Sequence, residues 1–206
     1  MELKLVVFDI GGVVIEICHT WTQAREVAGF SGPEPKLDRL SHSPFLDAYQ
    51  QDDLTLDEYC QALAENIGVT PEQALEVHKG ILMREYDGLL EIVTKLKEQG
   101  IKTACLSNTA EIHWQEMHRA DRFPAFQLFD IKMASHMERI NKPDPAIFHS
   151  MEDKAGVTGD QILFFEDTVR NVEGARAVGW RVRQIDPVNN PALQIKEELR
   201  ILGLDL

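Results

Sequence analysis

Short apolar runs alternate with amphipathic segments along most of the chain. Five of these runs suit strands, at residues 5–8, 101–106, 128–133, 162–165 and 181–185. Unbroken apolar runs of this length are typical of parallel strands that are buried on both faces. Segments with helical spacing lie between and after them, at residues 89–96, 110–119, 146–155, 169–178 and 191–202. The pattern predicts an α/β fold, in which helices cover a doubly wound, parallel, five-stranded Rossmann-like sheet.

One interval is too long for this alternation. About ninety residues separate the first run from the second, whereas a crossover between parallel strands needs only a dozen or so. Residues 54–67 and 71–83 show helical spacing. Thr55 and Thr70 stand where side chains that cap these two helices would stand. We therefore expect an inserted cap of several helices over the carboxyl edge of the sheet.

The inserted segment divides the chain into two predicted domains. Residues 1–16 and 86–206 would form the α/β core, and residues 17–85 would form the small helical cap. Some aromatic residues of the cap are candidates to select a substrate, or alternatively they pack only inside the cap. They are Trp21, Phe45 and Tyr49.

Charge and cysteine content narrow the classes of partner. The formal net charge is −13, from 34 acidic against 21 basic residues, and a field of this sign repels nucleic acid and anionic membrane surfaces. An anionic substrate would need a local cation, either a metal or a well-placed lysine. Three widely spaced cysteines without a CxxC pair indicate neither a disulfide framework nor a zinc site. No apolar run approaches the length of a membrane span, and we expect a cytoplasmic location.

The first strand ends in an acid. Asp9 follows the run that ends at Phe8, and Gly11 and Gly12 come shortly after it. Glycines allow a tight turn and a close approach of the backbone to a ligand. Open α/β sheets bind ligands at the carboxyl ends of their strands, so Asp9 is a candidate site residue. The alternative is an acid that only caps the next turn.

The second strand ends in hydroxyl and amide side chains. Ser107, Asn108 and Thr109 follow Leu106. A serine at this position, beside free backbone N–H groups at the start of a helix, can cradle a phosphate or an oxyanion. The alternative is that these residues only form the N-cap of the next helix.

A lysine follows the third strand in a loop that prolines make rigid. Lys142 precedes Pro143, Asp144 and Pro145, and prolines fix the backbone and favour the start of a helix. A lysine held in this way could neutralise a phosphate. The alternative is a solvated surface lysine.

The fourth strand ends in two adjacent acids. Glu166 and Asp167 follow Phe164 and Phe165. Apolar strands rarely end in charged residues that have no partner. A hard cation, which takes carboxylate ligands, would be a partner for these two acids. The alternative is a pair of exposed loop acids.

Taken in order, these segments resemble the haloacid dehalogenase (HAD) superfamily, most of whose members are magnesium-dependent phosphatases. The resemblance is to its bacterial branch of small sugar-phosphate phosphatases, which carry a helical cap after the first strand. The matching segments are residues 8–13, 106–109, 141–148 and 164–175. The resemblance implies a strand order of 5-4-1-2-3, counted along the core, which places Asp9 beside Asp167.

The resemblance also implies the role of each candidate residue. Asp9 would be the nucleophile that forms an aspartyl phosphate. The cofactor Mg²⁺ would be held by Asp9, Asp167 and the backbone carbonyl of Gly11, with Glu166 reaching it directly or through water. The phosphate-binding set would be Ile10, Gly11, Ser107, Asn108 and Lys142, of which Ser107 and Lys142 would also be catalytic. The substrate would be a small phosphorylated metabolite, for example a sugar phosphate.

One position departs from the family pattern. The phosphatases usually carry a second aspartate two residues after the nucleophile, as general acid and base, and here this position is Gly11. General acid–base catalysis is worth about 10²–10⁴-fold in rate, so turnover would be slow or limited to good leaving groups. Glu16 and His19 are candidate substitutes; alternatively, they are solvated residues at the entrance to the cap.

This departure keeps two other readings open. A 2-haloacid dehalogenase also uses an aspartate nucleophile and has no acid two residues later, but it needs no metal, and the Glu166–Asp167 pair argues for one. A catalytically weak or silent relative would bind a phosphorylated ligand or a partner protein, and Gly11 favours this reading. Magnesium-dependent release of phosphate from an aryl phosphate would separate the phosphatase from both.

Overall fold

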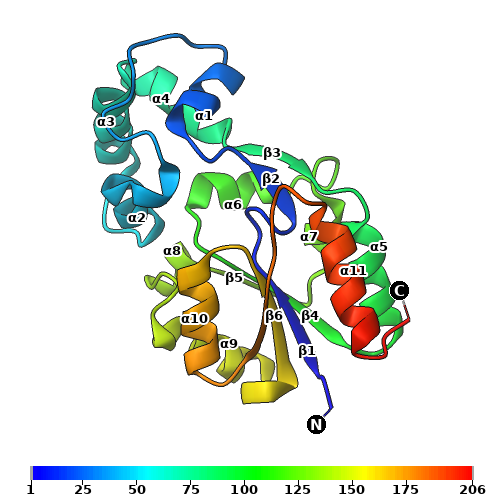
Figure 1. The fold of residues 1–206 in the computed structure, drawn as a ribbon. Coiled ribbons are helices and arrows are strands. Elements are labelled where there is room, and N and C mark those ends of the chain that lie inside the picture. Colours follow the sequence, from blue (N-terminus) through cyan, green and yellow to red (C-terminus); the bar gives the residue numbers. More distant parts are fainter. Residues whose placement is uncertain (1, 206) are drawn as a thin grey trace.

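The computed structural model describes residues 2–205. Its centre is a five-stranded sheet with the strand order β5-β4-β1-β6-β7, in which every neighbouring pair is parallel (Figure 1). The strands are β1 (Leu5–Phe8), β4 (Lys102–Ser107), β5 (Ile131–Ala134), β6 (Ile162–Glu166) and β7 (Arg181–Gln184). Counted along these five strands alone, the order is 5-4-1-2-3, which confirms the predicted topology.

Helices cover both faces of the sheet because alternate side chains of each strand point to opposite faces. From β1, Val6 and Phe8 pack into one core and Leu5 and Val7 into the other, and all four are fully buried. The first core is covered by α5 (Leu89–Glu98), α7 (Pro124–Leu128) and α11 (Pro191–Ile201). The second is covered by α9 (Pro145–Ala155) and α10 (Val169–Ala177). This double layer holds the carboxyl end of β1 at the centre of the molecule.

The predicted third strand was wrong at its start. Residues 128–133 were expected to form it, but Leu128 ends α7 and the strand begins at Ile131. Pro124 stands at the first helical position of α7, where a proline costs no hydrogen bond. A short apolar run cannot by itself distinguish a buried helical turn from a strand.

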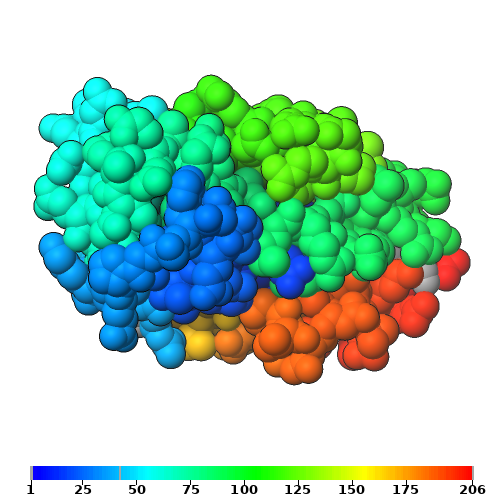
Figure 2. All heavy atoms as spheres, turned by 90° about the horizontal axis from the view of Figure 1, so that it is seen from above, coloured from blue at the N-terminus to red at the C-terminus, as the bar shows by residue number. Residues whose placement is uncertain are grey.

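The inserted segment folds into helices that stand above the carboxyl ends of the sheet strands (Figure 1). They are α1 (Trp21–Val27), η1 (Leu40–His42), α2 (Pro44–Gln50), α3 (Leu56–Ile67) and α4 (Pro71–Lys79). Thr55 and Thr70 cap α3 and α4 as predicted, each in a capping box with the residue three positions later. Seen from above, this segment covers one half of the molecule (Figure 2). The boundaries of the core and cap domains stay a prediction.

A two-stranded ribbon lies at the base of the insertion, and the sequence did not predict it. β2 (Ile15–Ile17) pairs antiparallel with β3 (Leu82–Glu85). The helix expected over residues 71–83 therefore ends early, at Lys79. Strands of three and four residues are too short for a periodic signal. The ribbon carries the chain from the sheet to the inserted helices and back.

The remaining elements are α6 (Glu111–Met117), α8 (Ser135–Glu138) and η2 (Gly159–Gln161). Cys18, Cys60 and Cys105 are free and buried, which agrees with the expected lack of a disulfide framework. Among residues 2–205, no helix has the length and apolar character needed to cross a membrane.

Candidate active site

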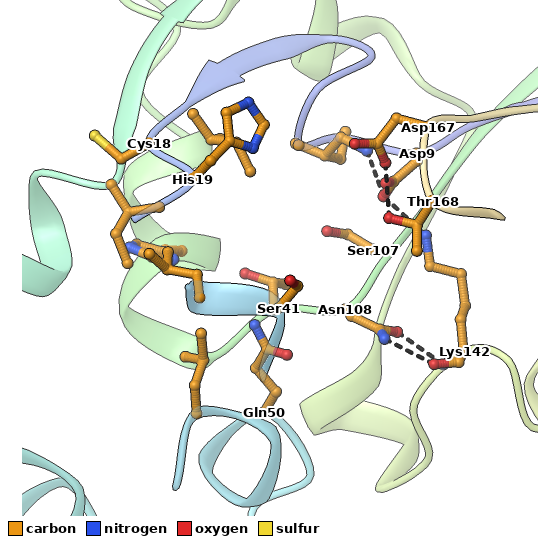
Figure 3. Close-up of a pocket in the computed structure, with 18 of the residues that line it drawn as sticks. Asp9, Cys18, His19, Ser41, Gln50, Ser107, Asn108, Lys142, Asp167 and Thr168 are labelled. Atoms are coloured by element: carbon orange, nitrogen blue, oxygen red, sulfur yellow. Dashed lines mark hydrogen bonds and ion pairs between the residues drawn. The ribbon is translucent and has the colours of Figure 1, made fainter. Parts of the chain in front are cut away.

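The predicted residues meet at one cavity between the sheet and the inserted helices. Asp9, Ser107, Lys142 and Asp167 all line it, and its volume is about 460 Å³ (Figure 3). Asp9 directly follows β1, Ser107 ends β4, and Asp167 directly follows β6. Neighbouring parallel strands bring their carboxyl ends to the same edge of the sheet, which is why residues distant in sequence converge here.

Lys142 is buried in an ion-pair cluster. Its Nζ lies 2.8 Å from Oδ1 of Asp9 and 2.6 Å from Oε2 of Glu166, and the residue is only 1% exposed. The alternative of a solvated surface lysine is therefore wrong. Burial alone would lower the pKa of Lys142, but Asp9 and Glu166 raise it above its ordinary value, so the ammonium stays charged.

Asn108 holds the loop that carries this lysine. Its Nδ2 donates to the Lys142 carbonyl at 3.0 Å, and its Oδ1 accepts from the Lys142 backbone N–H at 2.8 Å. Asn108 was predicted to bind phosphate, but its side-chain amide is occupied in positioning Lys142. A phosphate contact from Asn108 stays a prediction, and the backbone N–H is the group left for it.

The neighbouring Ser107 is 3% exposed and lines the cavity. It does not cap α6, because the N-cap residue of that helix is Ala110. Its hydroxyl lies in the cavity between Asp9 and the inserted helices (Figure 3). The position suits the predicted contact with a phosphoryl oxygen.

Three carboxylates converge around the lysine. Asp9, Glu166 and Asp167 each offer an oxygen, and these oxygens lie within 4.8 Å of one another. With one ammonium among three carboxylates, the ionised cluster carries two negative charges in excess. Burial and the Glu166 charge raise the pKa of Asp9 well above its ordinary value, and they raise the pKa of Asp167 to about 7. A divalent cation would remove this excess, and Mg²⁺ prefers oxygen ligands of this kind.

Glu166 is the acid least available to such a cation. Burial alone would raise its pKa, but Lys142 lowers it below the ordinary value. Both of its oxygens already have partners, since Oε2 faces Lys142 and Oε1 accepts from the Thr168 backbone N–H at 3.0 Å. Direct coordination by Glu166 stays a prediction, and the contacts favour a role in holding Lys142.

Two further features fit a hydrated cation beside Asp167. Gly12 has a φ of +78°, and a Cβ built on it would lie 2.7 Å from Oδ2 of Asp167, so only glycine leaves space for this carboxylate. Asn171 lines the same cavity, and its buried Oδ1 has no hydrogen-bond partner among the described residues. A buried acceptor of this kind needs a donor, such as a water molecule in the cavity.

Ile10 was predicted to bind phosphate, and its backbone N–H is the group that faces Asp9. It donates to Oδ1 of Asp9 at 2.7 Å, which also orients the carboxylate. Ile10 as a phosphate ligand stays a prediction. The side chain of Ile10 is fully buried in the core.

Gly11 stands where the family usually carries its second aspartate, and a side chain fills the space above it. A Cβ built on Gly11 would lie 2.9 Å from Cδ1 of Ile17, and Gly11 does not have a positive φ. The turn therefore tolerates another residue if the end of Ile17 moves. No carboxylate of the turn occupies the place of the missing acid.

The aromatic residues proposed to select a substrate do not line the cavity. Trp21 stacks on Phe45 at 5.9 Å between ring centroids, and Tyr49 stacks on Tyr59 at 4.3 Å. They belong to the apolar core of the inserted helices, so the alternative reading was correct. The inserted segment instead lines the cavity with His19, Arg39, Ser41, Leu46, Asp47 and Gln50.

Of the two proposed substitutes for the missing acid, only one faces the cavity. Glu16 pairs with Arg84 at 2.9 Å and lines a separate hollow beside Tyr86 and Pro187. His19 lines the cavity that contains Asp9 (Figure 3). Glu16 is therefore turned away from the reaction site.

A histidine pair joins the inserted helices to the core beside the cavity. The rings of His78 on α4 and His113 on α6 stack at 3.9 Å, and Nε2 of His113 lies 2.7 Å from the His78 carbonyl. Burial lowers the pKa of His113 to about 4, so its ring is neutral near pH 7. His113 lines the cavity, and the sequence did not identify it as a site residue.

Thr168 is a second residue that the sequence analysis missed. Its hydroxyl donates to Oδ1 of Asp167 at 3.1 Å, and its backbone N–H holds Glu166. It is the N-cap residue of α10. The available signal was a threonine directly after two acids at the end of a strand. Threonine is common at the N-cap of a helix, and this position places Thr168 at the same sheet edge as the acids.

Comparison with known proteins agrees with this arrangement. The sequence profile of the haloacid dehalogenase-like hydrolases matches residues 3–179. The phosphatase MT3486 of Mycobacterium tuberculosis is 26% identical over 213 residues, which cover 98% of this chain and 96% of that protein. The phosphorylated carbohydrates phosphatase of Thermotoga maritima is 22% identical over 180 residues, which cover 86% of this chain and 82% of that protein.

A solved structure shares the fold. The HAD family enzyme BT-2542 of Bacteroides thetaiotaomicron, in complex with magnesium and inorganic phosphate, has a TM-score of 0.71 and 21% identity to this chain. The match covers 89% of this chain and 94% of that one. Since the family profile spans most of its length, this chain belongs to the haloacid dehalogenase-like hydrolases.

Proposed function

We propose that this hydrolase is a Mg²⁺-dependent phosphatase that acts on a small phosphorylated metabolite. The observation that carries the proposal is a cluster at the cavity in which the buried ammonium of Lys142 pairs with Asp9 and Glu166, and an oxygen of Asp167 lies within 4.8 Å of theirs. Such a cluster can bind a divalent cation and a phosphoryl group side by side. Related proteins named as phosphatases, one of them for phosphorylated carbohydrates, support this activity.

In the proposed reaction Asp9 attacks phosphorus. A new bond forms between Oδ of Asp9 and phosphorus while the bond to the leaving oxygen breaks, which gives an aspartyl phosphate. Water then attacks phosphorus and frees the aspartate. Mg²⁺ held by Asp9, Asp167 and the Gly11 carbonyl would supply the positive charge that stabilises the phosphoryl oxygens.

The other residues of the cavity would assist this chemistry. Lys142, 2.8 Å from Asp9, favours the ionised form of the nucleophile and offsets the charge of an incoming phosphate. The Ser107 hydroxyl can donate to a phosphoryl oxygen. Glu166 and Asn108 act through Lys142, because they hold its side chain and its backbone.

The cavity also favours a small polar substrate. Its volume of about 460 Å³ is within the range of pockets for small ligands. Two arginines line it, Arg39 and Arg170, and neither makes an ion pair with a described residue. In a chain of net charge −13 they would draw an anionic metabolite toward Lys142.

Two other functions make different predictions. The absence of a carboxylate at Gly11 favours a weak or silent relative that only binds a phosphorylated ligand. A 2-haloacid dehalogenase would need no metal, and without a metal the excess negative charge around Asp167 would stay uncompensated. The chemical nature of the substrate and the location of the protein in the cell stay predictions.

The test is a screen of phosphorylated metabolites with Mg²⁺, measuring released phosphate. The proposal expects turnover of at least one small phosphate ester, loss of that turnover with a chelator, and no turnover in Asp9→Asn. Tight binding of a phosphorylated compound without phosphate release would support the silent relative. Halide release from a 2-haloacid without metal would support the dehalogenase.

A further inference from the structure

If the proposed function is correct, the reaction lacks a proton donor at its usual position, Gly11. We propose that His19 takes over this role, donating a proton to the leaving oxygen and later accepting one from the attacking water. The proton donor would then lie at the start of the inserted segment, whereas the turn after β1 would supply only the nucleophile, Asp9. This inference rests on the proposed phosphatase activity. Its test distinguishes a failure of the role of His19 from a failure of the proposed phosphatase activity.

The path of the chain directs His19 toward the site. Ile17 ends β2 with its Cδ1 2.9 Å from the Cβ position of Gly11. His19 follows two residues later, in a bend just after the strand, and it lines the cavity that contains Asp9. The residue between them, Cys18, is fully buried, and its sulfur contacts the Gly80 carbonyl at 3.6 Å. In Figure 3 the Cys18 sulfur points away from the cavity, and the His19 ring lies across it from Asp9.

The backbone of His19 is fixed, whereas its ring is available. The His19 backbone N–H donates to Oε1 of Gln23 at 3.0 Å, and its carbonyl accepts from the Leu40 N–H at 3.1 Å. The ring makes no hydrogen bond or ion pair with any described residue, and the residue is exposed. An anchored backbone with an unoccupied ring suits a group that binds substrate and exchanges protons.

Other groups of the cavity wall are less suited to this role. Lys142 is bound by two carboxylates, and the Asp167 carboxylate is assigned to the cation. The His113 ring is buried and bonded to the His78 carbonyl, and Asp47 already has an interaction of its own. Burial raises the pKa of Cys18 to about 11. Imidazole is the side chain that ordinarily gains and loses a proton near neutral pH.

The proposed steps balance. In the first, the His19 imidazolium gives its proton to the bridging oxygen as the bond from phosphorus to that oxygen breaks and the bond from Asp9 to phosphorus forms. The products are a neutral alcohol, an aspartyl phosphate and a neutral imidazole. In the second, the imidazole takes a proton from the water that attacks phosphorus, the bond to Asp9 breaks, and inorganic phosphate leaves.

The leaving group provides the sharpest test. Dinitrophenolate departs without a proton, whereas the alkoxide of glycerol phosphate needs one. We expect His19→Gln to lower kcat/KM on glycerol phosphate by about 10²-fold, with little change on 2,4-dinitrophenyl phosphate. The fall of the wild-type rate at basic pH on glycerol phosphate should also disappear. Glu16→Gln, a change on the neighbouring strand outside the cavity, is the matched control and should retain both activities.

The possible results separate the role of His19 from the proposed phosphatase activity. Equal losses of His19→Gln on both substrates, or no loss on either, would overturn the role of His19 while leaving the phosphatase intact. If the wild-type protein with Mg²⁺ hydrolysed neither ester nor any other phosphate, the proposed function would fail, and this inference with it.

A chemical footprint gives a second readout that does not depend on turnover. Diethyl pyrocarbonate modifies accessible histidine rings, and peptide mass spectrometry locates each modification. Inorganic phosphate with Mg²⁺ should protect His19, whereas His149, whose side chain is 58% exposed on α9, should stay reactive. Equal modification of His19 with and without phosphate would place its ring away from the bound phosphoryl group and contradict the proposal.

Discussion

The ammonium of Lys142 lies 2.6 Å from the carboxylate of Glu166, and both side chains are almost completely buried. Glu166 thereby fixes the lysine so that its Nζ also faces Asp9, at 2.8 Å. A buried charge pair of this kind is costly to form, and removal of one partner is costlier still. Its position beside Asp9, the proposed nucleophile, indicates that the pair serves the site more than the stability of the fold.

The first prediction concerns Lys142→Ala. Because the change leaves Asp9 and Glu166 buried without their cation, we expect the free energy of unfolding to fall by about 3–5 kcal/mol and phosphatase activity to be lost. Urea denaturation and phosphate release measure the two effects. Lys154→Ala is the control, since Lys154 pairs with Glu138 near the surface and should change stability by at most about 1 kcal/mol.

Lys132 is not a suitable second control. Its Nζ donates to the carbonyls of Gln127 and Phe129, so its removal would leave the end of α7 uncapped. If Lys142→Ala matched Lys154→Ala in both stability and activity, the ion-pair cluster would have no part in function.

The second prediction concerns the two glycines of the turn that follows Asp9. Gly11→Asp places a carboxylate where the family usually has one, and its Cβ displaces only the end of Ile17. We expect a folded protein, destabilised by about 1–3 kcal/mol from overpacking. In a His19→Gln background, Gly11→Asp should restore part of the rate on alkyl phosphates.

Gly12→Ala is the matched contrast. Its Cβ would lie 2.7 Å from the Asp167 carboxylate, at a φ of +78°, so metal-dependent activity should be lost although the change is smaller. Thermal melts separate this effect from unfolding. The turn geometry requires Gly12→Ala to be the more damaging of the two changes. An inactive Gly11→Asp protein together with a fully active Gly12→Ala protein would contradict it.

The sheet could be predicted from the sequence because its strands are unbroken apolar runs, and β1 was placed to the residue, at Leu5–Phe8. The β2–β3 ribbon could not, because its strands are too short to show a period. Start signals of helices were reliable where a side chain makes a local bond, as at Thr55 and Thr70.

The candidate site was predictable only in part, for a similar reason. Asp9, Ser107 and Asp167 stand at strand ends, and parallel strands bring such ends together. The bonds of Asn108 and Glu166 to Lys142 depend on side-chain directions that spacing does not reveal. The same is true of Tyr49, whose ring stacks on Tyr59 and does not face the cavity.

The third prediction concerns the pH dependence of stability through His113. Burial lowers its pKa in the folded protein to about 4, from an ordinary value of 6.5. Between these values the unfolded chain binds a proton that the folded protein does not, so stability is present above pH 6.5 and is lost as pH falls toward 4. The loss is on the order of 3 kcal/mol.

His113→Gln retains a donor for the His78 carbonyl but cannot titrate. Its free energy of unfolding, measured in urea from pH 7 to pH 4, should therefore fall less steeply than that of the wild-type protein. Parallel curves for the two proteins would mean that His113 does not contribute to the acid sensitivity of the fold.

The fourth prediction concerns the arginines at the cavity. Arg39→Ala and Arg170→Ala should each raise KM by about two- to fivefold, because an exposed charge contact is worth up to about 1 kcal/mol. The effect should shrink as salt is added. Arg176→Ala, on the last turn of the same helix as Arg170 and outside the cavity lining, is the control. An equal rise in KM for Arg176→Ala would assign the effect to overall charge.

The central claim is that Asp9 carries the phosphoryl group during turnover. The most direct measurement is rapid acid quenching of the protein with Mg²⁺ and an aryl phosphate, followed by mass spectrometry of the peptide that contains Asp9. The account predicts a phosphoryl group on Asp9 that forms only with Mg²⁺ and is absent from Asp9→Asn. Rapid phosphate release without any phosphoryl group on that peptide, or equal release by Asp9→Asn, would contradict it.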